Sequence, residues 1–183
     1  MSSSGIFTGT AGVYHVMSEL SLQRYHAAAT HGNAPSFDIL VCNCDGSQSV
    51  AIQVESTRWA TRERGRGESR TPTKLDFPLG CKAGKINSEK VLFAFVDFGV
   101  SPNQKPNVYL IPSTRLYSFC EPWIDNFEGK MVRFQPDIKW VEEFKNNWKP
   151  LTVAGIVASE PDVDGDENKP AQPAEADPST GSG

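Results

Sequence analysis

The first periodic stretch of hydrophobic positions lies near the start of the chain. Its members recur at intervals of three and four residues, the spacing that places side chains on one face of a helix. The stripe consists of Val13, Val16, Met17 and Leu20. It predicts a helix over about 10–24, with Thr10 as a suitable N-cap, and a short extended piece over 26–30 follows it.

Two neighbouring segments predict a β-hairpin. Residues 37–42 and 50–55 are rich in aliphatic residues, and Asp45-Gly46 between them is a strong turn signal. If these two are the turn residues, the numbers of opposite residues add to 91, which brings three apolar pairs onto one face. A slip of one residue would separate them. The pairs are Phe37 with Val54, Ile39 with Ile52, and Val41 with Val50.

The rest of the chain predicts further elements around this hairpin. Residues 58–87 are rich in Arg, Gly, Lys and Thr and predict a long loop, whereas 91–98 is almost continuously apolar, as a central buried strand is. A strand is expected over 107–111, then a helix capped by Ser113 that ends near residue 120. A last helix from Asp137 carries a buried stripe. That stripe consists of Trp140, Val141, Phe144 and Trp148. The order predicts an α/β fold, a mixed β-sheet flanked by helices.

Composition divides the chain of 183 residues into a domain and a tail. Residues 159–183 have no aromatic residue and are rich in Pro, Ala, Asp, Glu, Ser and Gly, so a disordered acidic tail is expected there. The tail holds seven of the 22 acidic residues and one of the 18 basic ones, which leaves 15 acidic and 17 basic residues over 1–158. A domain with a net charge of +2 permits contact with nucleic acid without requiring it.

Other sequence features exclude several classes of protein. The four cysteines match no zinc-binding spacing and are expected to be reduced thiols. The first residues lack the basic and apolar regions of a secretory signal. No apolar run reaches the roughly 20 residues that span a bilayer. We therefore expect a cytoplasmic protein that does not contact membranes.

The hairpin register also predicts a polar site. Asp38 would lie opposite Gln53, about 5 Å away between Cβ atoms, and Glu55 would lie two residues further along the same face. Two carboxylates and an amide oxygen suit a hard divalent cation such as Mg²⁺ or Mn²⁺, which can activate water for phosphodiester hydrolysis. A solvated hairpin face carrying ordinary polar residues is the alternative.

The same residues carry a resemblance to a known superfamily. Their order and spacing resemble those of the PD-(D/E)XK nuclease-like proteins, in which an Asp begins one strand and the next strand carries Glu or Gln, any residue, then Lys. The matching segments are 33–41, 52–56, the helix at 12–20, and the strands at 93–97 and 108–113. The resemblance spans about 9–120 and implies a restriction-endonuclease-like fold and a metal-dependent endonuclease, with Asp38, Gln53 and Glu55 as metal ligands and catalytic residues.

Two positions depart from the family pattern. Glu55 stands where the family has Lys, although some restriction enzymes of the superfamily also carry Glu there. Val13 stands where many small members have an acidic residue, and Glu19 is the nearest carboxylate on that helix. A site with Asp38 and Gln53 but no Lys is that of a weakened or inactive nuclease.

A basic segment follows the hairpin. Its arginines are interspersed with glycines and suit contacts to phosphate; an exposed, partly self-neutralised loop is the alternative. The residues are Arg58, Arg62, Arg64, Arg66 and Arg70. The expected partner is DNA, with RNA and a homodimer left open.

Three functions remain open from the sequence. The first is a DNA-cutting hydrolase that uses Mg²⁺ or Mn²⁺. The second is a catalytically inactive module that binds nucleic acid or protein, and the third is a structural subunit. Glu55 in the place of Lys separates the first two.

Overall fold

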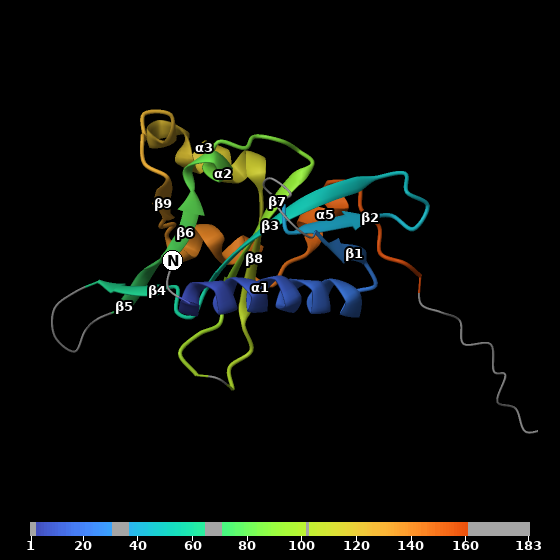
Figure 1. Cartoon of the computed structure of the whole chain (residues 1–183), viewed down its shortest axis with the longest axis horizontal. Coiled ribbons are helices and arrows are strands. Elements are labelled where there is room, and N and C mark those ends of the chain that lie inside the picture. The colour runs from blue at the N-terminus through green and yellow to red at the C-terminus, as the bar shows by residue number, and fades with distance from the viewer. Residues whose placement is uncertain (1–2, 31–36, 65–70, 102, 161–183) are drawn as a thin grey trace, which may run out of the picture.

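The computed structural model describes residues 3–30, 37–64, 71–101 and 103–160. Its centre is a five-stranded sheet in the order β1-β2-β3-β7-β8 (Figure 1). β3 and β7 run parallel, and every other neighbouring pair is antiparallel. Helices lie against this sheet, so the predicted α/β fold with a mixed sheet is confirmed. The strands are β1 (His26–Ala29), β2 (Ile39–Cys42), β3 (Ser49–Thr57), β7 (Val91–Asp97) and β8 (Asn107–Pro112).

The β2–β3 hairpin has the predicted register, although its turn differs. Ile39 pairs with Ile52 and Val41 with Val50, so partner numbers add to 91. The Gly46 N–H donates to a carbonyl three residues earlier, at 3.0 Å, so the central turn residues are 44 and 45 instead of 45 and 46. Gly46 follows them with φ 71°, which glycine adopts without steric cost.

Helix α1 (Ser3–Leu22) packs against β3 and buries the predicted stripe. Val16 and Leu20 are fully buried. Gly12 lets the helix approach the strand closely, because a Cβ at this position would collide with Ser56. The helix begins before residue 10, so the N-cap predicted at Thr10 is wrong.

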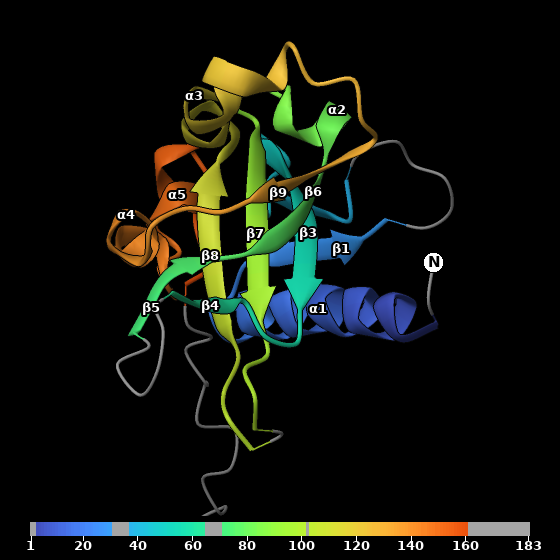
Figure 2. The same cartoon turned by 90° about the vertical axis from the view of Figure 1, so that its left-hand side faces the viewer.

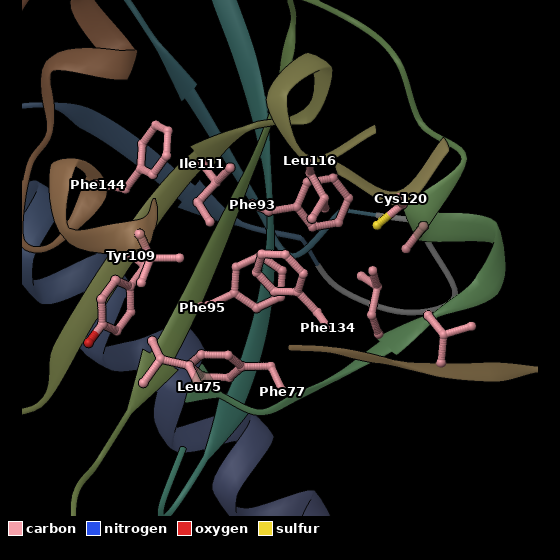
Figure 3. Close-up of a cluster of buried hydrophobic side chains, with 14 of the residues drawn as sticks. Leu75, Phe77, Phe93, Phe95, Tyr109, Ile111, Leu116, Cys120, Phe134 and Phe144 are labelled. Atoms are coloured by element: carbon pink, nitrogen blue, oxygen red, sulfur yellow. The ribbon is translucent and has the colours of Figure 1, made fainter. Parts of the chain in front are cut away.

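The opposite face of the sheet is covered by β6 (Phe77–Gly80), β9 (Met131–Phe134) and helix α3 (Ser113–Ile124). β6 and β9 pair with each other and cross in front of the central strands (Figure 2). Aromatic side chains fill the space between these layers (Figure 3), and the rings of Phe95 and Phe134 lie 4.7 Å apart. The sheet is therefore buried on both faces at β7, as its apolar sequence predicts.

The long loop predicted over 58–87 is wrong. The described part of this segment contains strands and a short helix, and β4 pairs with β5 as a separate hairpin. The apolar positions 75, 77 and 79 alternate with others and are buried, a period-2 signal that the basic composition around it concealed. The elements are β4 (Thr61–Arg64), β5 (Thr71–Leu75), β6 and α2 (Cys81–Gly84).

The single last helix is also wrong, because the segment is broken into three short pieces. Asn146 interrupts it at φ 49°. Its N–H donates to the Val108 carbonyl at 2.6 Å, and its Oδ1 accepts from the Val108 N–H at 2.9 Å. These two bonds tie the break to β8. The pieces are α4 (Ile138–Val141), the 3-10 helix η2 (Glu142–Phe144) and α5 (Lys149–Val153).

Ser113 does not cap α3 as predicted. It is the first residue of the helix, and its Oγ donates to the Ser88 carbonyl at 2.6 Å and accepts from the Ser88 N–H at 2.9 Å. The helix continues to Ile124, beyond the predicted end near residue 120. Ser113 therefore attaches the start of α3 to the segment before β7.

The first residues of the predicted tail contact the domain. The Ser159 N–H donates to the Arg24 carbonyl at 2.9 Å, and Ser159 Oγ lies 2.8 Å from His26 Nε2. The rest of that tail, 161–183, lies outside the described residues. Within the described part of the chain, no helix combines the length and apolar character needed to cross a bilayer.

Candidate active site

Asp38 lies one residue before β2 and is held by its backbone between two strands. Its N–H donates to the Ile52 carbonyl and its carbonyl accepts from the Thr30 N–H, both at 2.9 Å. The bond to Ile52 is one residue out of step with the β2–β3 register, as at a β-bulge. Asp38 and Ile39 therefore share Ile52 as partner. The direct pairs predicted for Asp38 with Gln53 and for Phe37 with Val54 do not form.

This one-residue shift of the ladder, the offset at Asp38, directs the Asp38 carboxylate onto β3. Its Oδ2 accepts a hydrogen bond from the Val54 N–H at 2.7 Å. Val54 separates Gln53 from Glu55 along the strand, so the carboxylate lies beside both. The Asp38 carboxylate therefore accepts the hydrogen bond that a backbone carbonyl would normally accept from Val54, and this bond holds it at the site.

Gln53 and Glu55 lie on the same face of β3. Side chains alternate along a strand, and the face of Ile52 and Val54 packs in the cluster that includes α1. The Gln53 Nε2 donates to Glu55 Oε1 at 3.3 Å. The structure thus places Gln53 and Glu55 on the face opposite α1, with the Asp38 carboxylate near enough for its charge to raise the pKa of Glu55.

Burial perturbs both carboxyl groups. Burial and, to a lesser extent, the negative charge of Asp38 raise the pKa of Glu55 to about 7, while the hydrogen bond from Gln53 opposes the shift. Burial also raises the pKa of Asp38, and the hydrogen bond from the Val54 N–H lowers it. Two carboxyl groups that repel each other in a half-buried site favour the uptake of a proton or a cation.

Gln53 supplies a further indication of a missing partner. Its Oε1 is buried and accepts no hydrogen bond from the described residues. A buried oxygen without a partner costs about 1–3 kcal/mol, and such atoms in native proteins usually meet a water or an ion. Since its Nε2 is committed to Glu55, the orphaned oxygen lies beside the carboxyl pair.

The donor set fits a hard divalent cation. Two carboxylates and one amide carbonyl are oxygen ligands of the kind that Mg²⁺ and Mn²⁺ prefer, with water and phosphate completing the shell. Among the described residues there is no group of three or more His, Cys, Asp or Glu side chains that could bind a metal. A cation here would therefore depend on the Gln53 amide as well as on the two carboxylates.

The predicted phosphate-binding arginines are described only in part. Arg58 directly follows β3 and is exposed. Arg62 and Arg64 lie on β4, and their side chains are outside what the structure describes; Arg66 and Arg70 fall wholly outside the described residues. Arg58 is thus the arginine of this group whose side chain the structure describes.

The two family positions on α1 have other roles. Val13 packs against the apolar cluster beneath the helix. Glu19 forms an ion pair with Lys105 at 3.2 Å, which links α1 to the segment before β8. Neither of these contacts involves the side chains of Asp38, Gln53 or Glu55.

One feature near Arg58 has no counterpart in the sequence pattern. A hollow of about 580 Å³ lies between α1 and the segment after β7, and Arg58, Phe7 and Phe98 line it. The available signal is weak: Phe7 stands at an exposed position of a helix, where an aromatic residue has no packing role. Only the tertiary structure brings these three residues together.

No family model and no curated protein matches the chain. A solved structure that resembles it is Hjc of the hyperthermophile Archaeoglobus fulgidus, a Holliday junction resolvase. The similarity covers 82% of this chain and 98% of that one, at 15% sequence identity and a TM-score of 0.40.

Proposed function

We propose that this protein is a metal-dependent nuclease that hydrolyses phosphodiester bonds in DNA, with Asp38, Gln53 and Glu55 as its site. The observation that carries the proposal is the buried Gln53 Oε1, which accepts no hydrogen bond from any described residue, beside two carboxyl groups of raised pKa. A divalent cation would satisfy that oxygen and neutralise the carboxylates. The order and spacing of the same residues resemble the PD-(D/E)XK proteins, which supports the restriction-endonuclease-like assignment.

The reaction assigns a separate task to each residue. In hydrolysis a water oxygen attacks phosphorus, one P–O ester bond breaks, and the departing oxygen takes up a proton. The bound cation would stabilise charge on the phosphate and make water a better nucleophile. Asp38 and Gln53 would hold the cation. Glu55 would orient the water or accept its proton, since a pKa of about 7 suits a general base at neutral pH.

A metal-binding experiment tests the site before any cleavage is measured. Titration of the protein with Mn²⁺ in a calorimeter should show binding in the wild type and a loss of at least about tenfold in affinity for Gln53→Ala. Gln48→Ala is a matched control, because Gln48 belongs to the same hairpin and its Oε1 accepts from Lys90 Nζ instead. Equal affinity in the wild type and Gln53→Ala would remove Gln53 from the ligand set.

Cleavage is then tested on purified full-length protein. Plasmid DNA, single-stranded DNA and RNA are incubated with Mg²⁺, Mn²⁺ or EDTA. Metal-dependent cleavage that disappears in Asp38→Asn and persists in Glu128→Gln, a change at an exposed carboxylate, supports the nuclease. Cleavage in EDTA would contradict it.

The position of Glu55 favours a second candidate, a catalytically inactive module with the same fold. An acidic side chain stands where the family places its Lys, so the site lacks that cation beside the scissile phosphate. Such a module should bind DNA or RNA and leave all the substrates intact with either metal.

A further inference from the structure

The hollow beside Arg58 combines aromatic walls with a single charge. Its apolar lining includes Phe7 from α1 and Phe98, Val100 and Pro106 from the segment that joins β7 to β8. Among the described residues of the lining, Arg58 is the charged one, and Gln104 contributes an amide. Since none of the described residues that line the hollow is a carboxylate, it suits a ligand that has a flat apolar part and an anionic group.

The hollow lies at the carboxyl ends of two parallel strands. Arg58 directly follows β3 and Phe98 directly follows β7, and the segment between β7 and β8 extends past α1 at this end of the sheet (Figure 2). Ligands of α/β sheets commonly bind in this position. The Cα atom of Arg58 lies three residues from that of Glu55, which limits their separation to about 11 Å. The Glu55 side chain lies on the face opposite α1 and the hollow adjoins α1, so a strand bound at both places would pass around the carboxyl ends of β3 and β7.

The polar wall of the hollow is held in place by its neighbours. Gly99 has φ 72°, and a Cβ there would lie 2.5 Å from Gln104 Oε1. The Gly99 N–H donates to Asp97 Oδ1 at 3.0 Å, and the Gln104 N–H donates to the Ser101 carbonyl at 3.1 Å. The Gln104 amide thus lies directly against the Gly99 backbone. A side chain at position 99 would displace it.

We propose that this hollow binds one unpaired nucleotide of a DNA strand. Its base would stack on the exposed ring of Phe7 and on Phe98, as bases do on aromatic side chains in single-strand-binding proteins. The Gln104 amide would hydrogen-bond the edge of the base. Arg58 would contact the phosphate through its guanidinium group.

Size and access favour an unpaired base over a duplex. A volume of about 580 Å³ accommodates a ligand of nucleotide size, and the faces of a paired base are covered by its neighbours in the stack. The Phe7 side chain is 73% exposed, so its ring is free to receive a base. This inference rests on the proposed function for one point only, that the strand in the hollow is also the strand presented to Glu55. The preferred substrate should then have an unpaired nucleotide beside the scissile phosphate.

Binding is tested in EDTA, where cleavage plays no part. Fluorescence anisotropy measures the affinity of the full-length protein for a labelled oligothymidylate, for an abasic strand of equal length and for a blunt duplex. The oligothymidylate should bind most tightly, and Phe7→Ala should weaken its binding about tenfold. Phe7→Ala should bind the abasic strand as well as the wild type does. Tyr14→Ala is the matched control, since Tyr14 is an exposed aromatic residue of the same helix that does not line the hollow.

Arg58→Ala provides a second variant that does not depend on Phe7. It should weaken binding of both strands and lower the slope of log affinity against log salt by about 0.7. The inference is overturned if Phe7→Ala binds oligothymidylate like the wild type, if the abasic strand binds equally well, or if the blunt duplex binds at least as tightly.

The outcomes separate this inference from the proposed function. If Phe7→Ala weakens binding but no nucleic acid is cleaved in Mg²⁺ or Mn²⁺, base binding in the hollow is supported and the nuclease proposal is rejected. If cleavage depends on metal but Phe7→Ala binds like the wild type, the nuclease proposal is supported and base binding in the hollow is rejected. A preference for hydrophobic peptides over oligothymidylate would also reject it.

Discussion

The Asp38 carboxylate accepts the backbone N–H of Val54 at 2.7 Å and so replaces a backbone carbonyl at the edge of β3. This relationship exists because the β2–β3 ladder shifts by one residue at Asp38. It fixes the carboxylate beside Glu55, and it makes Asp38 a structural residue as well as a candidate metal ligand.

The first prediction concerns that hydrogen bond. Asp38→Ala should lower the free energy of unfolding by about 1–3 kcal/mol, because the Val54 N–H loses its acceptor in a partly buried place. Asp38→Asn retains a carbonyl oxygen and should recover most of the loss. Urea denaturation near pH 5.5, where Glu55 is mostly protonated, measures both variants. Equal destabilisation by Ala and Asn would show that the hydrogen bond contributes little.

The second prediction concerns pH. The pKa of Glu55 is about 7 in the folded protein against an ordinary value of 4.5, so between these values the folded state retains a proton that the unfolded state releases. The free energy of unfolding should therefore fall as pH rises from about 4.5 to 7, by about 1–3 kcal/mol from this group. Glu55→Gln should lack that part of the decline. Denaturation in EDTA at several pH values measures it, and identical pH profiles for the two proteins would contradict the assignment.

The third prediction exchanges Glu55 for the residue that the resemblance leads one to expect. Glu55→Lys should raise metal-dependent cleavage, because a cation at this position stabilises the attacking hydroxide and the charge that develops on the phosphate. Asp38→Ala should abolish cleavage in the wild type and in the Lys variant alike. Initial rates on plasmid DNA with Mg²⁺ and Mn²⁺ measure the effect. Cleavage by Asp38→Ala at the wild-type rate would place the activity elsewhere or in a contaminant.

The fourth prediction concerns the basic segment after β3. Replacing Arg62, Arg64 and Arg66 with Ala should weaken nucleic-acid binding and reduce the salt slope by about two to three units for duplex DNA, since each lost phosphate contact releases about one counterion fewer. Anisotropy titrations between low and moderate salt measure the slope. Unchanged affinity at low salt would place the binding surface elsewhere on the protein.

The sequence by itself determined the elements whose patterns are local. The α1 stripe and the β2–β3 register follow from side-chain periodicity, because burying one face of a helix or hairpin leaves few alternatives. The β7 strand follows from its continuous apolar run. For the same reason the sequence alone placed Gln53 and Glu55 on one face of one strand.

The tertiary structure decided what depends on distant partners. The offset at Asp38 requires backbone bonds to Thr30, directly after β1, and to Ile52 on β3, and no local pattern contains both. β6 becomes a strand by pairing with β9, more than 50 residues away, and the bonds of Asn146 to β8 break a segment with helical periodicity. The hollow beside Arg58 likewise joins α1 to the ends of β3 and β7. Each of these features arises from hydrogen bonds or packing between residues far apart in the chain, and no local pattern in the sequence identifies the distant partner.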